Sequence, residues 1–67
     1  MKKSLNSLGQ RIKKIRKAKN ITQVELAVET GLSPSYIASI EQSVRMPSLK
    51  TLNKIAKSLN IKPNELL

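Results

Sequence analysis

Two short segments with helical signals stand only three residues apart in this chain. Thr22-Gln23-Val24-Glu25 has the pattern of a capping box, in which the Thr22 hydroxyl would accept from the Glu25 amide and the Glu25 carboxylate would accept from the Thr22 amide. Gly31 suits the end of the helix that follows, and Ser33-Pro34 suits the start of the next one. Because so short a connection forces two helices to cross steeply, the rest of the chain must fold around that crossing.

Apolar residues at helical spacing predict three more helices, and no segment shows the alternation of a strand. The first begins at Leu8, the fourth follows Ser48, and a short last one begins at Pro63. We therefore expect an all-α fold, a compact five-helix domain over residues 8–67, preceded by a flexible basic arm, residues 1–7. The expected core positions are Leu8, Ile12, Ile15, Leu26, Ala27, Leu32, Ile37, Ile40, Leu49, Leu52, Ile55, Ala56, Leu59 and Leu66.

Charge indicates the class of partner. The 67 residues include 13 Lys and Arg against 4 acidic residues, all glutamate, which gives a net charge of +9. Such an excess favours a polyanion, either nucleic acid or an anionic membrane. Cysteine and histidine are absent, so we expect no metal ion and no cofactor, and the lack of cysteine suits the cytoplasm. Enzymatic chemistry is the weakest hypothesis, because acid–base catalysis usually uses histidine or paired carboxylates.

A family resemblance extends over three segments: LGQRIKKIRKAKNITQ, QVELAVETGLSPSYIASIEQ and PSLKTLNKIAKSLNIKPNELL. They are similar to the first helix, the helix-turn-helix and the last helices of the lambda-repressor and Cro family, also called the xenobiotic-response-element family. The resemblance implies a cytoplasmic, bacterial or phage-encoded transcriptional regulator, with repressor as the expected form, that binds double-stranded DNA at a specific sequence. Its helix-turn-helix motif would span residues 23–42, and its recognition helix, residues 34–42, would enter the major groove.

The resemblance implies base contacts from four residues of the recognition helix: Pro34, Ser35, Tyr36 and Ser39. Serine hydroxyls donate or accept, the proline ring suits a thymine methyl group, and Tyr36 is the only aromatic residue of the chain. Each also has a plainer interpretation, as an exposed serine, a helix-starting proline or a half-buried tyrosine. Both interpretations stay open on the sequence alone.

Five further residues are expected to contact phosphates. Gln23 begins the second helix, where backbone amides attract an anion, and family members use the matching glutamine in this way. An ordinary first-turn residue is the alternative for Gln23. Ser33, Gln42, Arg45 and Lys50 flank the two ends of the recognition helix. Arg45 is the strongest of these candidates, because its loop should project towards the DNA backbone.

Glu41 is the only acidic residue of the recognition helix, where an exposed carboxylate would repel phosphates. In the family the matching glutamate pairs with an arginine of the first helix, so the resemblance implies a structural ion pair between Arg16 and Glu41. Three positions depart from the family pattern: Ser43, Asn20 and Lys62, of which Lys62 stands where serine or threonine often caps the last helix. Ser43 and Asn20 stand where glycine is common, which raises the question of left-handed backbone at both.

One recognition helix covers only a few base pairs, so we expect a homodimer on a near-palindromic operator. Ile61, Pro63, Leu66 and Leu67 are candidates for its interface, although Ile61 and Leu66 suit the core better. No membrane or small-molecule partner is expected, since the basic first helix resembles a lipid-binding helix but lacks Trp and Phe. The remaining alternative is a protein-interaction module of the same fold, such as an antitoxin.

Overall fold

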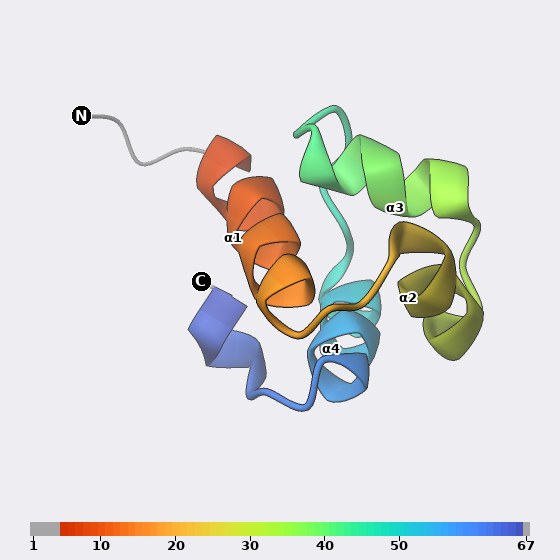
Figure 1. Ribbon diagram of the computed structural model, residues 1–67. Coiled ribbons are helices and arrows are strands. Elements are labelled where there is room, and N and C mark those ends of the chain that lie inside the picture. The colour runs from red at the N-terminus through yellow and green to blue at the C-terminus, as the bar shows by residue number, and fades with distance from the viewer. Residues whose placement is uncertain (1–4, 67) are drawn as a thin grey trace.

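The computed structural model of the protein describes residues 5–66, with side chains from Leu8 onwards, and contains no strand in this range. Its α-helices are α1 (Leu5–Ala18), α2 (Gln23–Thr30), α3 (Pro34–Glu41) and α4 (Leu49–Ser58), followed by a 3-10 helix, η1 (Pro63–Leu66) (Figure 1). α1 packs against α3 and η1, α2 packs against α3 and α4, and α4 packs against η1. These contacts form a closed ring, so η1 returns beside α1.

The expected all-α fold class is confirmed, with two corrections to its elements. α1 begins at Leu5 rather than at the expected Leu8, so residues 5–7 of the expected arm are helical. Leu5 continues the helical spacing of Leu8 and Ile12, and no Gly or Pro stands between Leu5 and Leu8 to stop the helix. The last expected helix is a 3-10 helix of 4 residues, a conformation typical of such short pieces. Residues 1–4 of the expected arm lie outside the described residues.

Side-chain hydrogen bonds at the helix ends explain where α2, α3 and α4 begin. The Thr22 hydroxyl accepts from the Glu25 amide at 3.0 Å, and Glu25 Oε1 accepts from the Thr22 amide at 2.8 Å, so the predicted capping box is confirmed. The hydroxyls of Ser33 and Ser48 accept from the backbone amides three residues ahead, at 3.1 and 3.2 Å. Each cap supplies an acceptor to an amide that the helix itself leaves unsatisfied.

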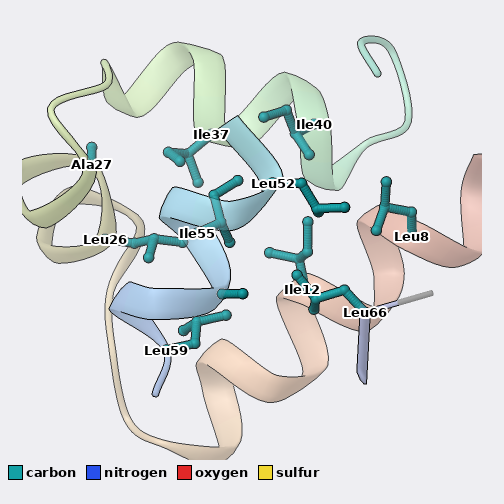
Figure 2. Close-up of a cluster of buried hydrophobic side chains, with 11 residues drawn as sticks. Leu8, Ile12, Leu26, Ala27, Ile37, Ile40, Leu52, Ile55, Leu59 and Leu66 are labelled. Carbon is teal, nitrogen blue, oxygen red and sulfur yellow. The ribbon is translucent and has the colours of Figure 1, made fainter. Parts of the chain in front are cut away.

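Every helix contributes to one apolar core (Figure 2). Ile15 and Leu32 are half-buried against it, as are Tyr36 and Ile61. Leu49, an expected core residue, is instead 71% exposed, because it is the first residue of α4 and lies one turn outside the packed stripe. The buried apolar side chains are Leu8, Ile12, Leu26, Ala27, Ile37, Ile40, Leu52, Ile55, Ala56, Leu59 and Leu66.

α1 and α3 approach each other so closely at Gly9 that no side chain fits between them. A Cβ atom at Gly9 would lie 2.3 Å from the carbonyl oxygen of Ile40 and 2.9 Å from that of Glu41. Both neighbours are backbone atoms of the last turn of α3, and they cannot move aside without moving the helix. Glycine at this position therefore sets the distance between α1 and α3.

Gly9→Ala should lower the free energy of unfolding by about 3 kcal/mol, because the added methyl group forces α1 and α3 apart. Gly31→Ala is the matched control. A Cβ atom at Gly31 would meet nothing within 4 Å, so its cost is only that of a left-handed φ of 73°, about 1–2 kcal/mol. Denaturant unfolding followed by circular dichroism measures both changes, and equal losses would contradict the close approach of α1 and α3.

Three residues other than glycine adopt left-handed backbone where a helix ends: Asn20 (φ 60°), Ser43 (φ 65°) and Asn60 (φ 61°). Asn20 and Ser43 are thus left-handed, as their family positions suggest. Asparagine adopts this conformation at lower cost than most residues, whereas serine has no such advantage. Ser43 is therefore the most strained of the three.

Ser43→Gly should raise the melting temperature, with a gain of about 1 kcal/mol in the free energy of unfolding, because glycine adopts the left-handed conformation without steric cost. Asn60→Gly, at φ 61°, should give a smaller gain. Thermal denaturation of the two variants and the unsubstituted chain gives the comparison. An unchanged or lower melting temperature for Ser43→Gly would speak against strain at this position.

Candidate nucleic-acid interface

The turn between α2 and α3 fixes how α3 is presented. The Gly31 backbone is left-handed, and the Leu32 amide donates to the Ala27 carbonyl at 2.9 Å. Leu32 packs against the core, into which α3 also places Ile37 and Ile40. Backbone bonds and core packing together therefore determine which side of α3 points outward.

The four candidate base-contacting residues differ in exposure. Pro34 and Ser35 are exposed, whereas Tyr36 and Ser39 are half-buried. Tyr36 packs against the core cluster, and the Ser39 hydroxyl donates to the Tyr36 carbonyl at 2.7 Å. The start of α3 is thus fully open at two of the four positions and partly open at the other two. With its proton used inside the helix, the Ser39 hydroxyl keeps only lone pairs to offer to a ligand.

The five candidate phosphate-contacting residues lie at both ends of α3 and at the start of α2. Ser33 is the exposed N-cap of α3, and Gln42 is its exposed C-cap. Arg45 and Lys50, beyond the end of α3, are also exposed. Gln23 differs from these four, because it is half-buried and its Nε2 donates to Glu41 Oε1 at 3.0 Å.

The loop from α3 to α4 is folded back onto α3. The amides of Val44 and Arg45 both donate to the Ser39 carbonyl, at 2.8 and 3.2 Å, after the left-handed turn at Ser43. Pro47, near the end of the loop, is buried. The exposed Arg45 side chain therefore projects from a backbone that is anchored beside the last turns of α3.

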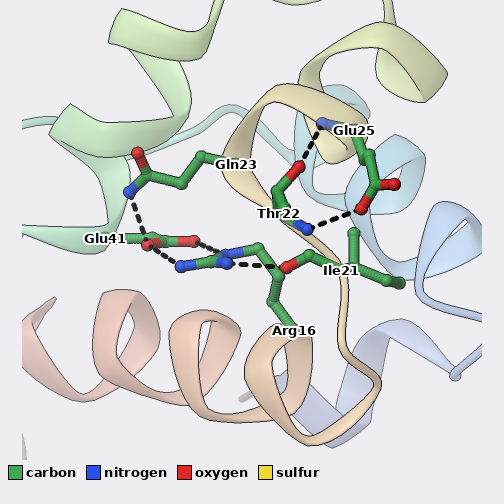
Figure 3. A network of polar contacts seen from close by, with 6 residues as sticks. All are labelled: Arg16, Ile21, Thr22, Gln23, Glu25 and Glu41. Carbon is green, nitrogen blue, oxygen red and sulfur yellow. Dashed lines mark hydrogen bonds and ion pairs between the residues drawn. The ribbon is translucent and has the colours of Figure 1, made fainter.

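The ion pair expected between Arg16 and Glu41 is present and buried (Figure 3). Arg16 Nε donates to Glu41 Oε2 at 2.6 Å, and Arg16 Nη2 donates to Glu41 Oε1 at 3.0 Å. The third guanidinium nitrogen, Nη1, donates to the Ile21 carbonyl at 2.7 Å. The side chains of Arg16 and Glu41 are 7% and 2% exposed. A two-pronged pair of this kind fixes the direction as well as the distance between α1 and α3.

The exposed positive charge of the described residues lies on and just after α1, on α4 and in the segments beside α4, and none of it lies on α3. α3 contains neither Lys nor Arg, and its one acidic residue, Glu41, is buried and paired. Each exposed glutamate of the described residues accepts an internal hydrogen bond: Glu25, Glu29 and Glu65. The described surface is therefore positively charged while α3 itself exposes no charge, and an excess of exposed cations suits a polyanion. Its exposed cations are Lys13, Lys14, Lys17, Lys19, Arg45, Lys50, Lys54, Lys57 and Lys62.

Between residues 5 and 66, no helix combines the length and the apolar character that crossing a membrane requires. Within the same range, no three side chains of the metal-binding types His, Cys, Asp and Glu come together as a group that could hold a metal ion.

Sequence reasoning missed the hydrogen bond from Gln23 to Glu41. The two residues are 18 positions apart and belong to different helices, so no local pattern indicates the contact. It also missed the exposed apolar side chains of Val28 and Val44, which are 75% and 71% exposed. Val28 lies within α2 and Val44 lies shortly after α3. The spacing of apolar residues alone does not show whether such side chains are buried.

The helix-turn-helix family matches residues 12–66. The chain belongs to this family. The match begins inside α1 and ends with η1, so it includes both partners of the ion pair and all of α2 and α3. The resemblance to the lambda-repressor and Cro type of helix-turn-helix, which rested on the sequence segments, is thereby confirmed.

Individual relatives agree with this assignment. The immunity repressor protein of Bacillus phage phi105 is 46% identical over 61 residues, which are 91% of this chain but only 42% of the repressor, so this chain spans less than half of that relative. The restriction-modification controller protein C.AhdI from Aeromonas hydrophila has a similar fold, with a TM-score of 0.92 and 40% identity over 94% of this chain and 96% of its own. SinR, the master regulator for biofilm formation, was solved in complex with DNA; its TM-score is 0.83 at 38% identity, over 88% of this chain and 95% of its own.

Glu41→Ala should lower the free energy of unfolding by about 3–5 kcal/mol, because it leaves the Arg16 guanidinium buried without its partner. Glu29→Ala is the control, since the Glu29 carboxylate is exposed and only accepts from the Ser58 hydroxyl at 2.6 Å. Removing it should cost less than about 1 kcal/mol. Urea unfolding of both variants tests this, and similar small losses would mean that the pair contributes no more than a surface contact.

Proposed function

We propose that this chain binds a specific sequence of double-stranded DNA and acts as a transcriptional regulator, with repressor as the expected form. The observation that carries the proposal is the open, uncharged start of α3, with exposed Arg45 and Lys50 beyond its other end, in a chain of the helix-turn-helix family. The repressor and controller names of the relatives, and the DNA complex of SinR, support the same function. The chain would contribute binding and not catalysis.

In this proposal α2 and α3 form the helix-turn-helix motif, residues 23–42, and α3 with its C-cap Gln42 is the recognition helix, residues 34–42. An α-helix fits the major groove of B-form DNA, and the first residues of a recognition helix meet the base edges. The exposure of Pro34 and Ser35 at the start of α3 supports this orientation. The packing of α3 against both α1 and α2 would hold the helix in a fixed direction in the groove.

Four side chains would contact bases, each with a different chemistry. The Ser35 hydroxyl can donate or accept, and the Pro34 ring can cover a thymine methyl group. Ser39 would accept from an amino group of adenine or cytosine, because its own proton is bound to the Tyr36 carbonyl. Tyr36 would contribute its ring edge or its hydroxyl from a half-buried position.

Phosphate contacts would fix the register of α3 in the groove. Ser33 and Gln23 stand at the starts of α3 and α2, where backbone amides favour an anion. Gln42, Arg45 and Lys50 are exposed beyond the other end of α3. Contacts at both ends of α3 would hold the helix between the two DNA strands whose phosphates border the groove.

A single recognition helix reaches too few base pairs for specificity, so the proposed form is a homodimer on a near-palindromic operator, with half-sites about 34 Å apart. Ile61 packs against the core and Leu66 is 1% exposed, so both serve the fold of the monomer. Of the four candidate interface residues, Pro63 is exposed and Leu67 lies outside the described residues. Of the four candidates, Pro63 is therefore the one that the structure describes as exposed and available for the proposed interface.

Selection from a pool of random-sequence duplexes by the purified chain tests the function directly. The bound duplexes should converge on one near-palindromic sequence, and the affinity should fall steeply as salt is raised, because bound Lys and Arg displace condensed counterions. A pool that shows no enrichment, with every duplex bound equally weakly, would refute specific recognition.

Arg45→Ala and Ser35→Ala should weaken DNA binding in different ways. Arg45→Ala should reduce affinity for the selected duplex and for a scrambled duplex alike, and lower the salt slope of the log affinity by about 1. Ser35→Ala should reduce affinity for the selected duplex by about tenfold while leaving the scrambled duplex and the salt slope unchanged. Fluorescence anisotropy over a salt series separates the two patterns. If the patterns were exchanged, the assignment of α3 to the groove would be wrong.

A further inference from the structure

The Glu41 carboxylate binds two partners from different helices (Figure 3). Its Oε2 accepts from Arg16 Nε at 2.6 Å, and its Oε1 accepts from both Arg16 Nη2 and Gln23 Nε2, each at 3.0 Å. Arg16 also donates to the Ile21 carbonyl in the turn before α2. One buried carboxylate in the last turn of α3 thus connects α1, the α1–α2 turn and the first residue of α2.

Gln23 stands where this network reaches the surface. It is the first residue of α2 and is half-buried, so its carboxamide has one side towards Glu41 and is partly open to solvent. Nε2 carries two protons, of which one is used by Glu41, and Oε1 is not needed for that bond. The backbone amides of the first two helical residues, Gln23 and Val24, have no acceptor within a helix. The remaining N–H of the carboxamide and these two amides can bind the same anion.

We propose that Glu41 is a positioning residue for DNA binding, because the carboxylate that pairs with Arg16 also holds the Gln23 carboxamide in the orientation that receives a phosphate. This inference rests on the proposed function. Glu41 itself is 5% exposed and does not touch DNA in this proposal. Glu41 acts by restricting the conformations of the Gln23 side chain before DNA binds. The entropy cost of ordering that side chain then no longer opposes binding.

Burial of the pair makes this positioning effective. The Arg16 charge neutralises Glu41, so the carboxylate accepts from Gln23 without presenting net negative charge to a nearby phosphate. The Gln23 bond also lies where water has limited access, which makes the bond harder to exchange for a bond to solvent. A lysine at position 23 would bind a phosphate as a point charge in many orientations, whereas a neutral glutamine depends on the direction of its N–H groups.

A double-mutant cycle on DNA affinity tests the proposal. The pair is replaced by apolar residues in Arg16→Met/Glu41→Leu, since buried ion pairs exchanged for apolar side chains often retain stability. In the unsubstituted chain, Gln23→Met should weaken binding to the selected duplex by about tenfold. In the Arg16→Met/Glu41→Leu background, where Gln23 is no longer held, Gln23→Met should weaken binding by less than about twofold. Gln10→Met, at an exposed glutamine of α1, is the matched control and should leave affinity unchanged.

A merely structural role for the pair gives a different result. In that case Gln23→Met would have the same effect in both backgrounds, and the loss of the pair would alter the melting temperature only. Circular dichroism shows whether each variant is folded at the temperature of the binding measurement. Equal effects of Gln23→Met in both backgrounds overturn the proposal.

A second measurement needs neither a substitution in the pair nor DNA. In the unsubstituted chain, the side-chain amide protons of Gln23 should differ in chemical shift from those of a free glutamine, and the Gln23 side chain should show a high NMR order parameter. Gln10, which is exposed, should show free-glutamine shifts and a low order parameter. Identical behaviour of the two glutamines overturns the proposal even if the Arg16→Met/Glu41→Leu variant does not fold. A held Gln23 in a chain that enriches no duplex would instead refute the proposed function alone.

Discussion

The buried pair of Arg16 and Glu41 is the interaction on which the arrangement of the first three helices depends. Its hydrogen bonds stay within the protein: three nitrogens of the guanidinium donate, and both oxygens of the carboxylate accept. Such a pair gives little net stability when compared with apolar residues, because both charges must leave water. Its effect is to exclude other arrangements of the helices, since any shift of α1 relative to α3 separates two buried charges that have no other charged partner among the described residues.

Close steric contact acts on the same part of the molecule. The absence of a side chain at Gly9 lets α1 reach the carbonyl oxygens of Ile40 and Glu41, so α1 fixes the last turn of α3 both by close contact and by charge. The first turn of α3 is fixed differently, by the Ser33 cap and by Ile37 in the core. The exposed residues between these two ends are therefore oriented by contacts at both ends of this helix of 8 residues.

Most of the fold could be predicted from the sequence, because its signals are local. The capping box at Thr22, the serine caps and the apolar spacing of α1, α2 and α4 each depend on residues within one or two turns of each other. The errors came where local signals end. Leu49 continues the apolar stripe of α4 but lies beyond the reach of the other helices, and α1 begins at Leu5, three residues before the expected Leu8.

The candidate site was less predictable, since its details depend on contacts between helices. The resemblance to the family supplied the ion pair, but nothing local indicates that Gln23 joins it or that the Ser39 proton is bound within α3. The exposure of Pro34 and Ser35 follows from the burial of Ile37 and Ile40, which the spacing did predict. The spacing of apolar residues therefore predicts which face of a helix is exposed. Only the packing of the helices shows which polar groups already have a hydrogen-bond partner.

The lack of charge on α3 has a consequence for how such a domain can evolve. Attraction to a polyanion arises from Lys and Arg on α1, on α4 and in the loop before α4, whereas the groups that would discriminate bases are small and neutral. If α3 reads bases as proposed, replacing Ser35 or Ser39 would alter the preferred DNA sequence without weakening the general attraction to nucleic acid. A duplicated copy of the gene would then change its target in small steps, with each intermediate still able to bind DNA.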